Sequence, residues 1–168
     1  MLIVGIDPGT LHLGWGVIRT EGTKLVHVDH GIIHTNPDDE LARRLVTIDD
    51  GLEEMLREHR PEQGAVEALF FAKDAQAAAK LGHARGVALL RLVRAGVSIH
   101  EYPPARVKRA LAGNGQADKH QVGMMVKTVL GLREVPGVDA SDALAVAITH
   151  ARVAKFDETL RAGGVKLR

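Results

Sequence analysis

The chain opens with Leu2-Ile3-Val4-Gly5-Ile6-Asp7-Pro8-Gly9-Thr10, a short apolar run that ends in one carboxylate and a turn. The run is rich in β-branched residues, which is typical of a strand buried on both faces in the middle of a sheet. Pro8-Gly9 favours a turn because Pro fixes φ and Gly accepts positive φ. Asp7 is therefore predicted at the end of a central strand, where its carboxylate either caps the turn or reaches a metal ion or ligand.

The rest of the chain alternates strand-like and helical patterns. Strand-like runs follow at 13–19 and 25–34, and spacings of three and four residues from Leu41 to Met55 predict a helix. Another apolar run at 65–71 carries Glu67. A strand after a crossover helix lies parallel to an earlier strand, so we expect Glu67 near Asp7. The alternative for Glu67 is a solvent-facing position on an edge strand.

A long Ala-rich segment predicts a helix over 74–95, in which Ala78, Gly82 and Gly86 follow one another at intervals of four residues. This strip lacks bulk, and Gly inside a helix costs about 1 kcal/mol relative to Ala. The strip therefore indicates close approach by another backbone, either the helix's own sheet or a second copy of the chain. We favour the second copy and predict a homodimer interface at these three residues.

The last third of the chain predicts one more strand and three helices. The strand covers 97–102, a short helix covers 105–111, Asp118 caps the next helix, and the last helix starts near Asp139. The apolar pattern fades after Phe156. The order of elements predicts one α/β domain at 1–155, with a mixed five-stranded sheet flanked by helices, and a flexible C-terminal tail at 156–168.

Composition excludes several classes of site. The 168 residues include no cysteine, so disulfides and zinc–thiolate sites are excluded. No stretch is long enough to span a membrane and the N-terminus does not resemble a signal peptide, so we expect a cytoplasmic protein. Residues 1–70 hold 13 acidic and 6 basic side chains, whereas 71–133 hold 3 acidic and 11 basic ones. Such a basic block indicates a polyanionic partner, or a set of solvated helix faces.

Asp139 and Asp142 are three residues apart at the start of the last predicted helix, so they share one face. Their plain interpretation is helix capping and a favourable position in the helix dipole. Together with Asp7 and Glu67, however, they give four carboxylates that converge on one end of the sheet. Clustered carboxylates without His or Cys suit Mg²⁺ or Mn²⁺. Two such ions about 4 Å apart are a known arrangement for phosphodiester hydrolysis.

Several short motifs follow one another along the chain. They are Gly5-Ile6-Asp7-Pro8-Gly9, Glu67 with Phe70 and Ala72-Lys73, Lys80-Leu81-Gly82-His83-Ala84-Arg85-Gly86-Val87-Ala88, Val107-Lys108, Lys119 with Gln121-Val122, and Asp139-Ala140-Ser141-Asp142. In order and spacing this set resembles the RuvC family of Holliday junction resolvases over residues 1–155. The resemblance implies a ribonuclease H-like fold and a homodimer that makes paired symmetric nicks in four-way DNA junctions during recombination and repair.

The resemblance also implies roles for individual residues. Asp7, Glu67, Asp139 and Asp142 match the family's catalytic, metal-binding acids, with two Mg²⁺ or Mn²⁺ ions per site as the expected cofactor. The implied DNA contacts are Phe70, Phe71, Lys73, Lys80, Arg85, Lys108 and Lys119. Strand alternation turns one of Phe70 and Phe71 inward. The implied partners are a junction-binding protein and its branch-migration motor.

Three departures and three rival interpretations accompany this resemblance. One departure is the tail after Phe156, which has no counterpart in the family pattern. Ala68 follows Glu67 where a Gln is common in the family, and Phe71 adds a second aromatic residue. Gly-Ile-Asp-x-Gly-Thr is also the phosphate-loop pattern of actin-like ATPases and sugar kinases, but those need two such domains. A ribonuclease H acting on another nucleic acid, and a junction-binding module without catalysis, are the other rivals.

Overall fold

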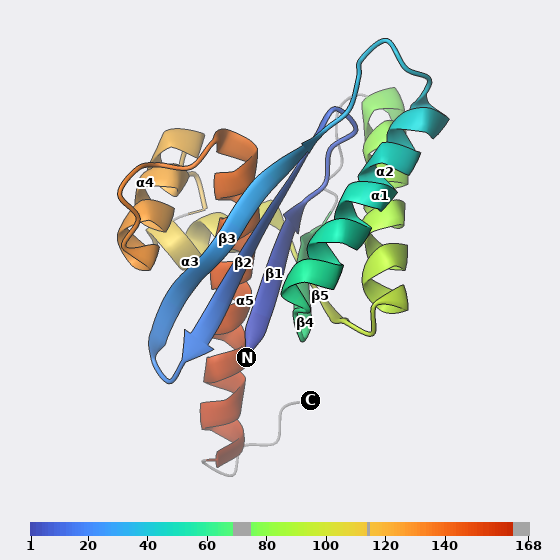
Figure 1. Ribbon diagram of the computed structural model, residues 1–168. Coiled ribbons are helices and arrows are strands. Elements are labelled where there is room, and N and C mark those ends of the chain that lie inside the picture. The colour runs from blue at the N-terminus through green and yellow to red at the C-terminus, as the bar shows by residue number, and fades with distance from the viewer. Residues whose placement is uncertain (69–74, 114, 163–168) are drawn as a thin grey trace.

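The computed structural model describes residues 1–68, 75–113 and 115–162, with side chains described as far as residue 154. The strands are β1 (Leu2–Asp7), β2 (His12–Glu21), β3 (Lys24–His34), β4 (Gln63–Glu67) and β5 (Ser98–Tyr102). The helices are α1 (Leu41–His59), α2 (Ala75–Arg94), α3 (Pro104–Ala112), α4 (Lys119–Leu130) and α5 (Val138–Ala162). Figure 1 shows these elements around one twisted sheet.

The sheet is mixed and has the strand order β3-β2-β1-β4-β5. β1 and β2 are antiparallel, as are β2 and β3, whereas β4 runs parallel to both β1 and β5. The predicted five-stranded α/β fold is thus confirmed, with the apolar run after Met1 at its centre. The crossover rule correctly places β4 beside β1.

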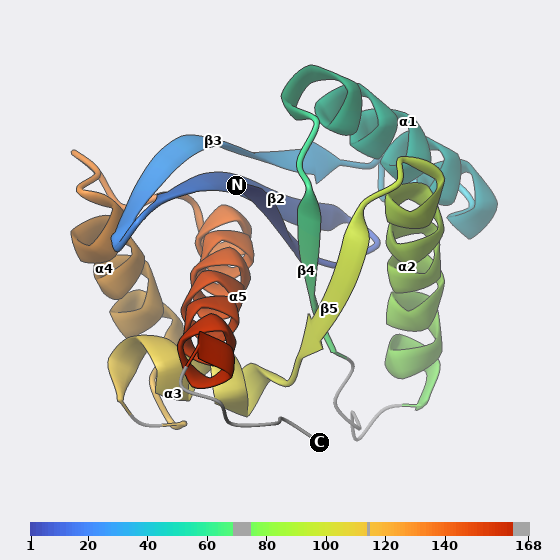
Figure 2. The same ribbon diagram turned by 90° about the horizontal axis from the view of Figure 1, so that it is seen from below.

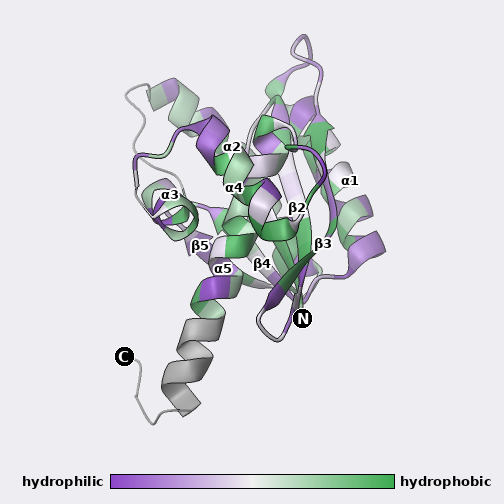
Figure 3. Cartoon of the chain, turned by 90° about the vertical axis from the view of Figure 1, so that its left-hand side faces the viewer, coloured by the Kyte–Doolittle hydropathy of each residue, from purple (hydrophilic) through white to green (hydrophobic). Residues whose placement is uncertain are grey.

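Helices cover both faces of the sheet. Figure 2 shows α1 and α2 on one face and α5, α3 and α4 on the other. β1 serves both layers, because Ile3 belongs to the core under α5 while Val4 and Ile6 belong to the core under α1 and α2. Figure 3 shows hydrophobic residues gathered along the strands and the adjoining helix surfaces.

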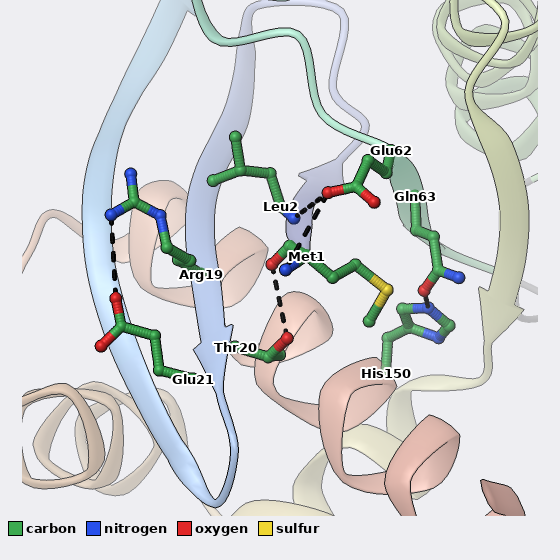
Figure 4. A network of polar contacts seen from close by, with 8 residues as sticks. All are labelled: Met1, Leu2, Arg19, Thr20, Glu21, Glu62, Gln63 and His150. Carbon is green, nitrogen blue, oxygen red and sulfur yellow. Dashed lines mark hydrogen bonds and ion pairs between the residues drawn. The ribbon is translucent and has the colours of Figure 1, made fainter.

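Polar contacts close the end of the sheet where the chain begins (Figure 4). The Leu2 amide donates to Glu62 Oε1 over 2.9 Å, and the Thr20 hydroxyl donates to the Met1 carbonyl over 3.4 Å. Gln63 Oε1 lies 2.6 Å from His150 Nε2 on α5. These contacts fix β1, β2, β4 and α5 together at this end. The loops that follow Asp7 and Glu67 lie at the opposite end, which is called the loop end below.

The last helix is longer than its apolar pattern predicts. α5 continues through Ala162, past Phe156, where the sequence pattern places the start of a tail. Its final residues include good helix formers without a repeating apolar face, and intrinsic propensity extends a helix in such a case. The predicted tail at 163–168 lies outside the described residues. No helix in the described part of the chain is long and apolar enough to cross a bilayer.

Candidate active site

Two carboxylates lie side by side at the loop end of the sheet. Asp7 is the last residue of β1 and Glu67 is the last residue of β4. These strands are parallel neighbours, with Ile6 opposite Val66 in the register, so both acids leave the sheet at the same edge. A hydrogen bond joins the two side chains. The predicted juxtaposition of Asp7 and Glu67 is confirmed.

Two glycines bring the first turns of α5 onto this edge. A Cβ built on Gly14 of β2 would lie 2.1 Å from the Asp139 carbonyl oxygen, and one on Gly5 of β1 would lie 2.0 Å from that of Ala143. The helix backbone therefore occupies the space that side chains fill elsewhere. Ser141 Oγ donates to the Pro136 carbonyl over 3.0 Å and fastens the first turn. Asp139 follows Val138, the first residue of α5, so it lies inside the helix and is not its N-cap.

A small cavity of about 240 Å³ forms where these elements meet α3 and α4. The charged side chains in its wall are Asp7, Glu67, Asp142, Lys108 and Lys119. Three of the four predicted acids therefore share one cavity with two of the four predicted lysines, Lys108 and Lys119. Asp139 is not part of the wall, although its charge helps to raise the pKa of Lys119.

Burial and mutual repulsion make the acids hard to ionise. Burial, followed by the charges of Glu67 and Asp142, raises the pKa of Asp7 from 3.8 to about 8. Burial also raises the pKa of Glu67, although the hydrogen bond to Asp7 acts in the opposite direction. At neutral pH Asp7 therefore holds a proton that it shares with Glu67. A divalent cation that binds here must displace that proton.

Lys119 neutralises the third acid of the cavity. Its Nζ lies 3.1 Å from Asp142 Oδ2. Burial acts to lower the pKa of Lys119, but the hydrogen bond to Asp142 and the charges of Asp142, Asp7 and Asp139 outweigh burial and raise the pKa overall. Among the described residues, no three His, Cys, Asp or Glu side chains stand ready to hold one ion together. A cation that takes Asp142 as a ligand would compete with the Lys119 ammonium for this carboxylate.

The donor chemistry of the cavity nevertheless fits a hard divalent cation. Its candidate ligands are carboxylate oxygens, which Mg²⁺ and Mn²⁺ prefer. The raised pKa of Asp7 shows that its ionised form is disfavoured, first by burial and then by repulsion from Glu67 and Asp142. A cation that replaces the shared proton relieves this repulsion.

The other predicted DNA contacts lie apart from the cavity wall or outside the described residues. Lys80 and Arg85 are on α2, in the layer on the other face of the sheet from α3 and α4, and Arg85 is hydrogen-bonded to Glu101. Phe70, Phe71 and Lys73 fall within 69–74, outside the described residues. The predicted roles of these five residues in DNA binding therefore stay predictions.

Sequence patterns did not reveal two residues that position the site. The Tyr102 carbonyl accepts a hydrogen bond from the Ala68 amide over 2.9 Å, which holds the backbone just after Glu67. The Tyr102 hydroxyl lies 2.7 Å from Nδ1 of His150, which is buried in α5. Tyr102 thus links the end of β4 to the helix that carries Asp142. A single tyrosine and an isolated histidine leave no periodic signal in a sequence.

The site and its fold agree with a known family of nucleases. A family model described as crossover junction endodeoxyribonuclease RuvC matches residues 3–150. The chain belongs to the RuvC family. A curated relative of that name from Sorangium cellulosum (strain So ce56) is 55% identical over 164 residues, which cover 98% of this chain and 92% of the relative. The RuvC family resemblance of the sequence is thus confirmed.

Solved structures support the same assignment. The structure titled "T. thermophilus RuvC in complex with Holliday junction substrate" is 40% identical, has a TM-score of 0.87, and covers 94% of this chain and 96% of its own. The yeast mitochondrial Holliday junction resolvase Ydc2 is 9% identical with a TM-score of 0.64 over 95% of this chain and 83% of its own, and so shares the fold alone. This RuvC family chain is an endodeoxyribonuclease of crossover junctions with a ribonuclease H-like fold. Nucleases of this family are metal-dependent.

Proposed function

We propose that this chain resolves four-way DNA junctions by paired symmetric nicks, with Asp7, Glu67, Asp139 and Asp142 holding two Mg²⁺ or Mn²⁺ ions. The observation that carries the proposal is the pair of buried, proton-sharing carboxylates at the ends of β1 and β4. Lysines line the same cavity, as a phosphodiester substrate requires. The 40% identical relative that was solved with a Holliday junction supports the choice of substrate.

The bound metal supplies an activated water and charge stabilisation for the leaving oxygen. The protein supplies the ligands and their arrangement. Asp7 and Glu67 are held by the parallel strands, whereas Asp142, and Asp139 one turn earlier, are held by α5. Asp139 joins the ligand set through a change of its side-chain rotamer, because its backbone contacts Gly14, the residue opposite Asp7 in the β1–β2 register.

Lys119 has a double role in this proposal. In the protein alone its ammonium balances Asp142. With DNA bound, the same ammonium is free to contact the scissile phosphate and to stabilise negative charge that develops there in the transition state. Lys108 lines the same cavity and contacts the adjacent phosphate. One of Phe70 and Phe71 stacks on junction bases, and Lys73, Lys80 and Arg85 bind phosphates farther away.

Symmetric nicks require two active sites, and α2 offers the surface for a dimer. α2 buries Ala84, Ala88 and Leu92 against the sheet. On its other side Gly86 has no described atom within 4 Å of an added Cβ, and Leu90 and Val93 are 51% and 63% exposed. These residues continue the strip that starts at Ala78 and Gly82. A second copy that packs here covers the exposed apolar side chains and places two cavities on one junction.

The proposal includes two protein partners, a junction-binding protein and its branch-migration motor. Only the family resemblance supports these partners. A ribonuclease H acting on RNA–DNA hybrids is the main alternative, because the same fold and acids serve that substrate. A junction-binding module without catalysis is disfavoured by the energetic cost of keeping Asp7 and Glu67 buried together.

The test compares three substrates and two proteins, the native chain and one variant. A synthetic four-way junction, a linear duplex and an RNA–DNA hybrid are incubated with Mg²⁺ or Mn²⁺ and either the native chain or Asp7→Asn. Symmetric nicks in the junction alone, lost in Asp7→Asn, support the proposal. Cleavage of the hybrid instead moves the substrate to ribonuclease H, and junction binding without a cut leaves only a recognition module.

Lys119→Gln separates catalysis from binding. If Lys119 stabilises the transition state, this substitution lowers the single-turnover rate by about 10²-fold or more, in the range found for removal of one stabilising donor, while the junction Kd changes much less. Lys24→Gln is the matched control, because Lys24 starts β3 at the opposite end of the sheet. An equal loss of rate and affinity makes Lys119 a plain phosphate contact.

A further inference from the structure

Two histidines meet at the solvent-exposed end of the β2–β3 hairpin. His12 and His34 lie directly opposite each other in the antiparallel register. Their Nδ1 atoms are 3.0 Å apart, and both side chains are exposed. The ring centroids are 5.1 Å apart with an angle of 76° between the ring planes. Two ring nitrogens therefore converge on one point that water can reach.

The backbone around this pair is fixed. The Thr35 amide donates to the Leu11 carbonyl over 3.0 Å, and Thr35 Oγ1 donates to the Thr10 carbonyl over 2.7 Å. The irregularity in the β2–β3 pairing lies between Val17 and Ile18, several residues away from the pair. Because the strands hold both Cα atoms in register, the two imidazoles are preorganised as a pair.

The separation of the two nitrogens is compatible with two neighbouring ligands of one metal ion. With metal–nitrogen bonds of about 2.0–2.1 Å, a nitrogen separation of 3.0 Å gives a nitrogen–metal–nitrogen angle of about 90–97°. That is the angle between neighbouring ligands in square-planar or octahedral coordination, whereas tetrahedral Zn²⁺ needs about 3.3 Å. Tetragonal sites with nitrogen and oxygen ligands favour Cu²⁺ and Ni²⁺.

We propose that His12 and His34 form a second cation site, a two-imidazole site for Ni²⁺ or Cu²⁺ in which water fills the remaining positions. Binding at both Nδ1 atoms requires that the proton between them moves to an exposed Nε2, so each ring stays neutral. The site differs in chemistry from the carboxylate cavity, because oxygen ligands suit Mg²⁺ and imidazoles suit later transition metals. The cation links β2 to β3 beside the loop that follows Asp7.

A second histidine pair, His27 and His30, lies within β3, the strand that also carries His34, and provides a contrast. His27 Nε2 lies 2.8 Å from His30 Nδ1, but these side chains are partly buried, and burial lowers the pKa of His27. A partly buried pair leaves less room for the water ligands of a tetragonal ion than the exposed pair does. His27 and His30 therefore serve as the internal control for the exposed pair.

The experiment uses the full chain without a purification tag, in saturating Mg²⁺ so that the carboxylate cavity is filled. NiCl₂ is titrated by calorimetry, and CuSO₄ is followed by electron paramagnetic resonance, which counts coordinated nitrogens. The native chain is expected to bind one equivalent through two nitrogens and to melt at a higher temperature with Ni²⁺, because the ion binds only the folded form. His12→Gln and His34→Gln are expected to weaken that site at least tenfold, whereas His27→Gln retains it.

Three results overturn the proposal. The first is a Ni²⁺ titration of His12→Gln that superimposes on that of the native chain. The second is a loss in His27→Gln as large as the loss in His12→Gln. The third is a copper spectrum without two equivalent nitrogens. Circular dichroism melts of the metal-free variants show that each is folded, which is expected because both side chains are exposed.

Discussion

At the scale of single residues, Asp7 combines a demand of the chemistry with a cost in stability. Its carboxyl is held at a pKa of about 8 by burial and by the charges of Glu67 and Asp142. The unfolded chain releases the same proton near the ordinary value of 3.8. The folded state therefore binds more protons than the unfolded state between these two values. By linkage, the free energy of unfolding falls as pH rises through this range.

This linkage predicts that Asp7→Asn stabilises the metal-free protein while abolishing cleavage. Asn is neutral at every pH, so the variant avoids the burial of a charge that the native chain suffers at pH 8. Its melting temperature is expected to exceed that of the native chain by a few degrees, since each kcal/mol corresponds to about 2–4 °C in a domain of this size. The gain should shrink at pH 5, where Asp7 is protonated. Calorimetric melts of both proteins in EDTA measure it.

Asp38→Asn is the control for this prediction, because Asp38 is exposed outside the cavity. Added Mg²⁺ should raise the melting temperature of the native chain more than that of Asp7→Asn. A variant that melts below the native chain at pH 8 would contradict the assigned charge balance.

His150 is the second residue whose environment determines its protonation. Nε2 donates to Gln63 Oε1, which can only accept, so Nδ1 is left to accept from the Tyr102 hydroxyl. The contact with Tyr102 requires a neutral imidazole, because a protonated Nδ1 cannot accept a hydrogen bond. Burial, with the neighbouring His100 charge as a smaller cause, lowers the pKa of His150 from 6.5 to about 4.

The lowered pKa of His150 predicts a loss of stability in mild acid. Between pH 6.5 and about 4 the unfolded chain takes up a proton that the folded chain does not, so the free energy of unfolding falls as pH falls. The loss from this residue reaches up to about 3 kcal/mol by pH 4 and then levels off. Urea unfolding of the native chain and His150→Gln between pH 4 and 7 measures it. The variant is expected to show the shallower slope, and equal slopes would contradict this assignment.

At the scale of elements, the close contact of α5 with β1 and β2 sets the position of the acids on α5. Gly5 and Gly14 leave room for the backbone of α5 itself. Gly5→Ala puts a methyl group where the Ala143 carbonyl lies, so α5 must move. We expect a loss of about 1–3 kcal/mol in stability, as for other overpacked cores. We also expect a loss of cleavage that extra Mg²⁺ does not restore.

Gly115→Ala is the matched control for Gly5→Ala, since its added Cβ would meet the nearest described atom at an ordinary 3.5 Å. Urea unfolding and single-turnover cleavage of both variants make the comparison. If Gly5→Ala cleaves as fast as the native chain, the position of α5 on β1 does not control the site.

The first turn of α4 is a second element with a measurable role, because it carries Lys119. Asp118 Oδ1 accepts from the Gln121 amide over 2.8 Å, and Gln121 Oε1 accepts from the Asp118 amide over 3.1 Å. Asp118→Ala removes half of this capping box, which costs about 1 kcal/mol. Fraying then releases Lys119, so the cleavage rate should fall several-fold while junction affinity changes little. Asp118→Asn, which still caps, should restore the rate; failure of that rescue would separate the cap from Lys119.

Local features of this fold can be predicted from the sequence, whereas contacts between distant elements cannot. The helical period predicted α2, the Asp118 cap was read correctly from one residue, and the crossover rule placed Glu67 beside Asp7. The Lys119–Asp142 ion pair and the contact of Gly14 with Asp139 were not predicted, because they depend on how α4 and α5 dock after the sheet has formed. Lys108 and Lys119 line the cavity and Lys80 does not, because α3 and α4 lie beside the cavity and α2 lies on the other face of the sheet.

At the scale of the whole molecule, the two helical layers have different tasks. α3, α4 and α5 surround the cavity, whereas α2 on the other face presents exposed apolar side chains. Exposed apolar side chains that gather on one helix face mark a surface for another protein. Val46 of α1, the other helix of this layer, is also 60% exposed. The layer of α1 and α2 is therefore the side on which we expect a second copy.

This arrangement predicts that Leu90→Glu converts a dimer into a monomer. Leu90 is 51% exposed in the single chain, so the substitution leaves the fold stable, but a second copy would have to bury the new charge. Analytical ultracentrifugation should show the molecular mass halved. Met124→Glu is the control, because Met124 is 42% exposed on α4, away from α2, and should leave the mass unchanged. Each Leu90→Glu monomer keeps its own cavity, so it should nick junctions singly, and paired symmetric nicks by a monomer would contradict the proposed dimer.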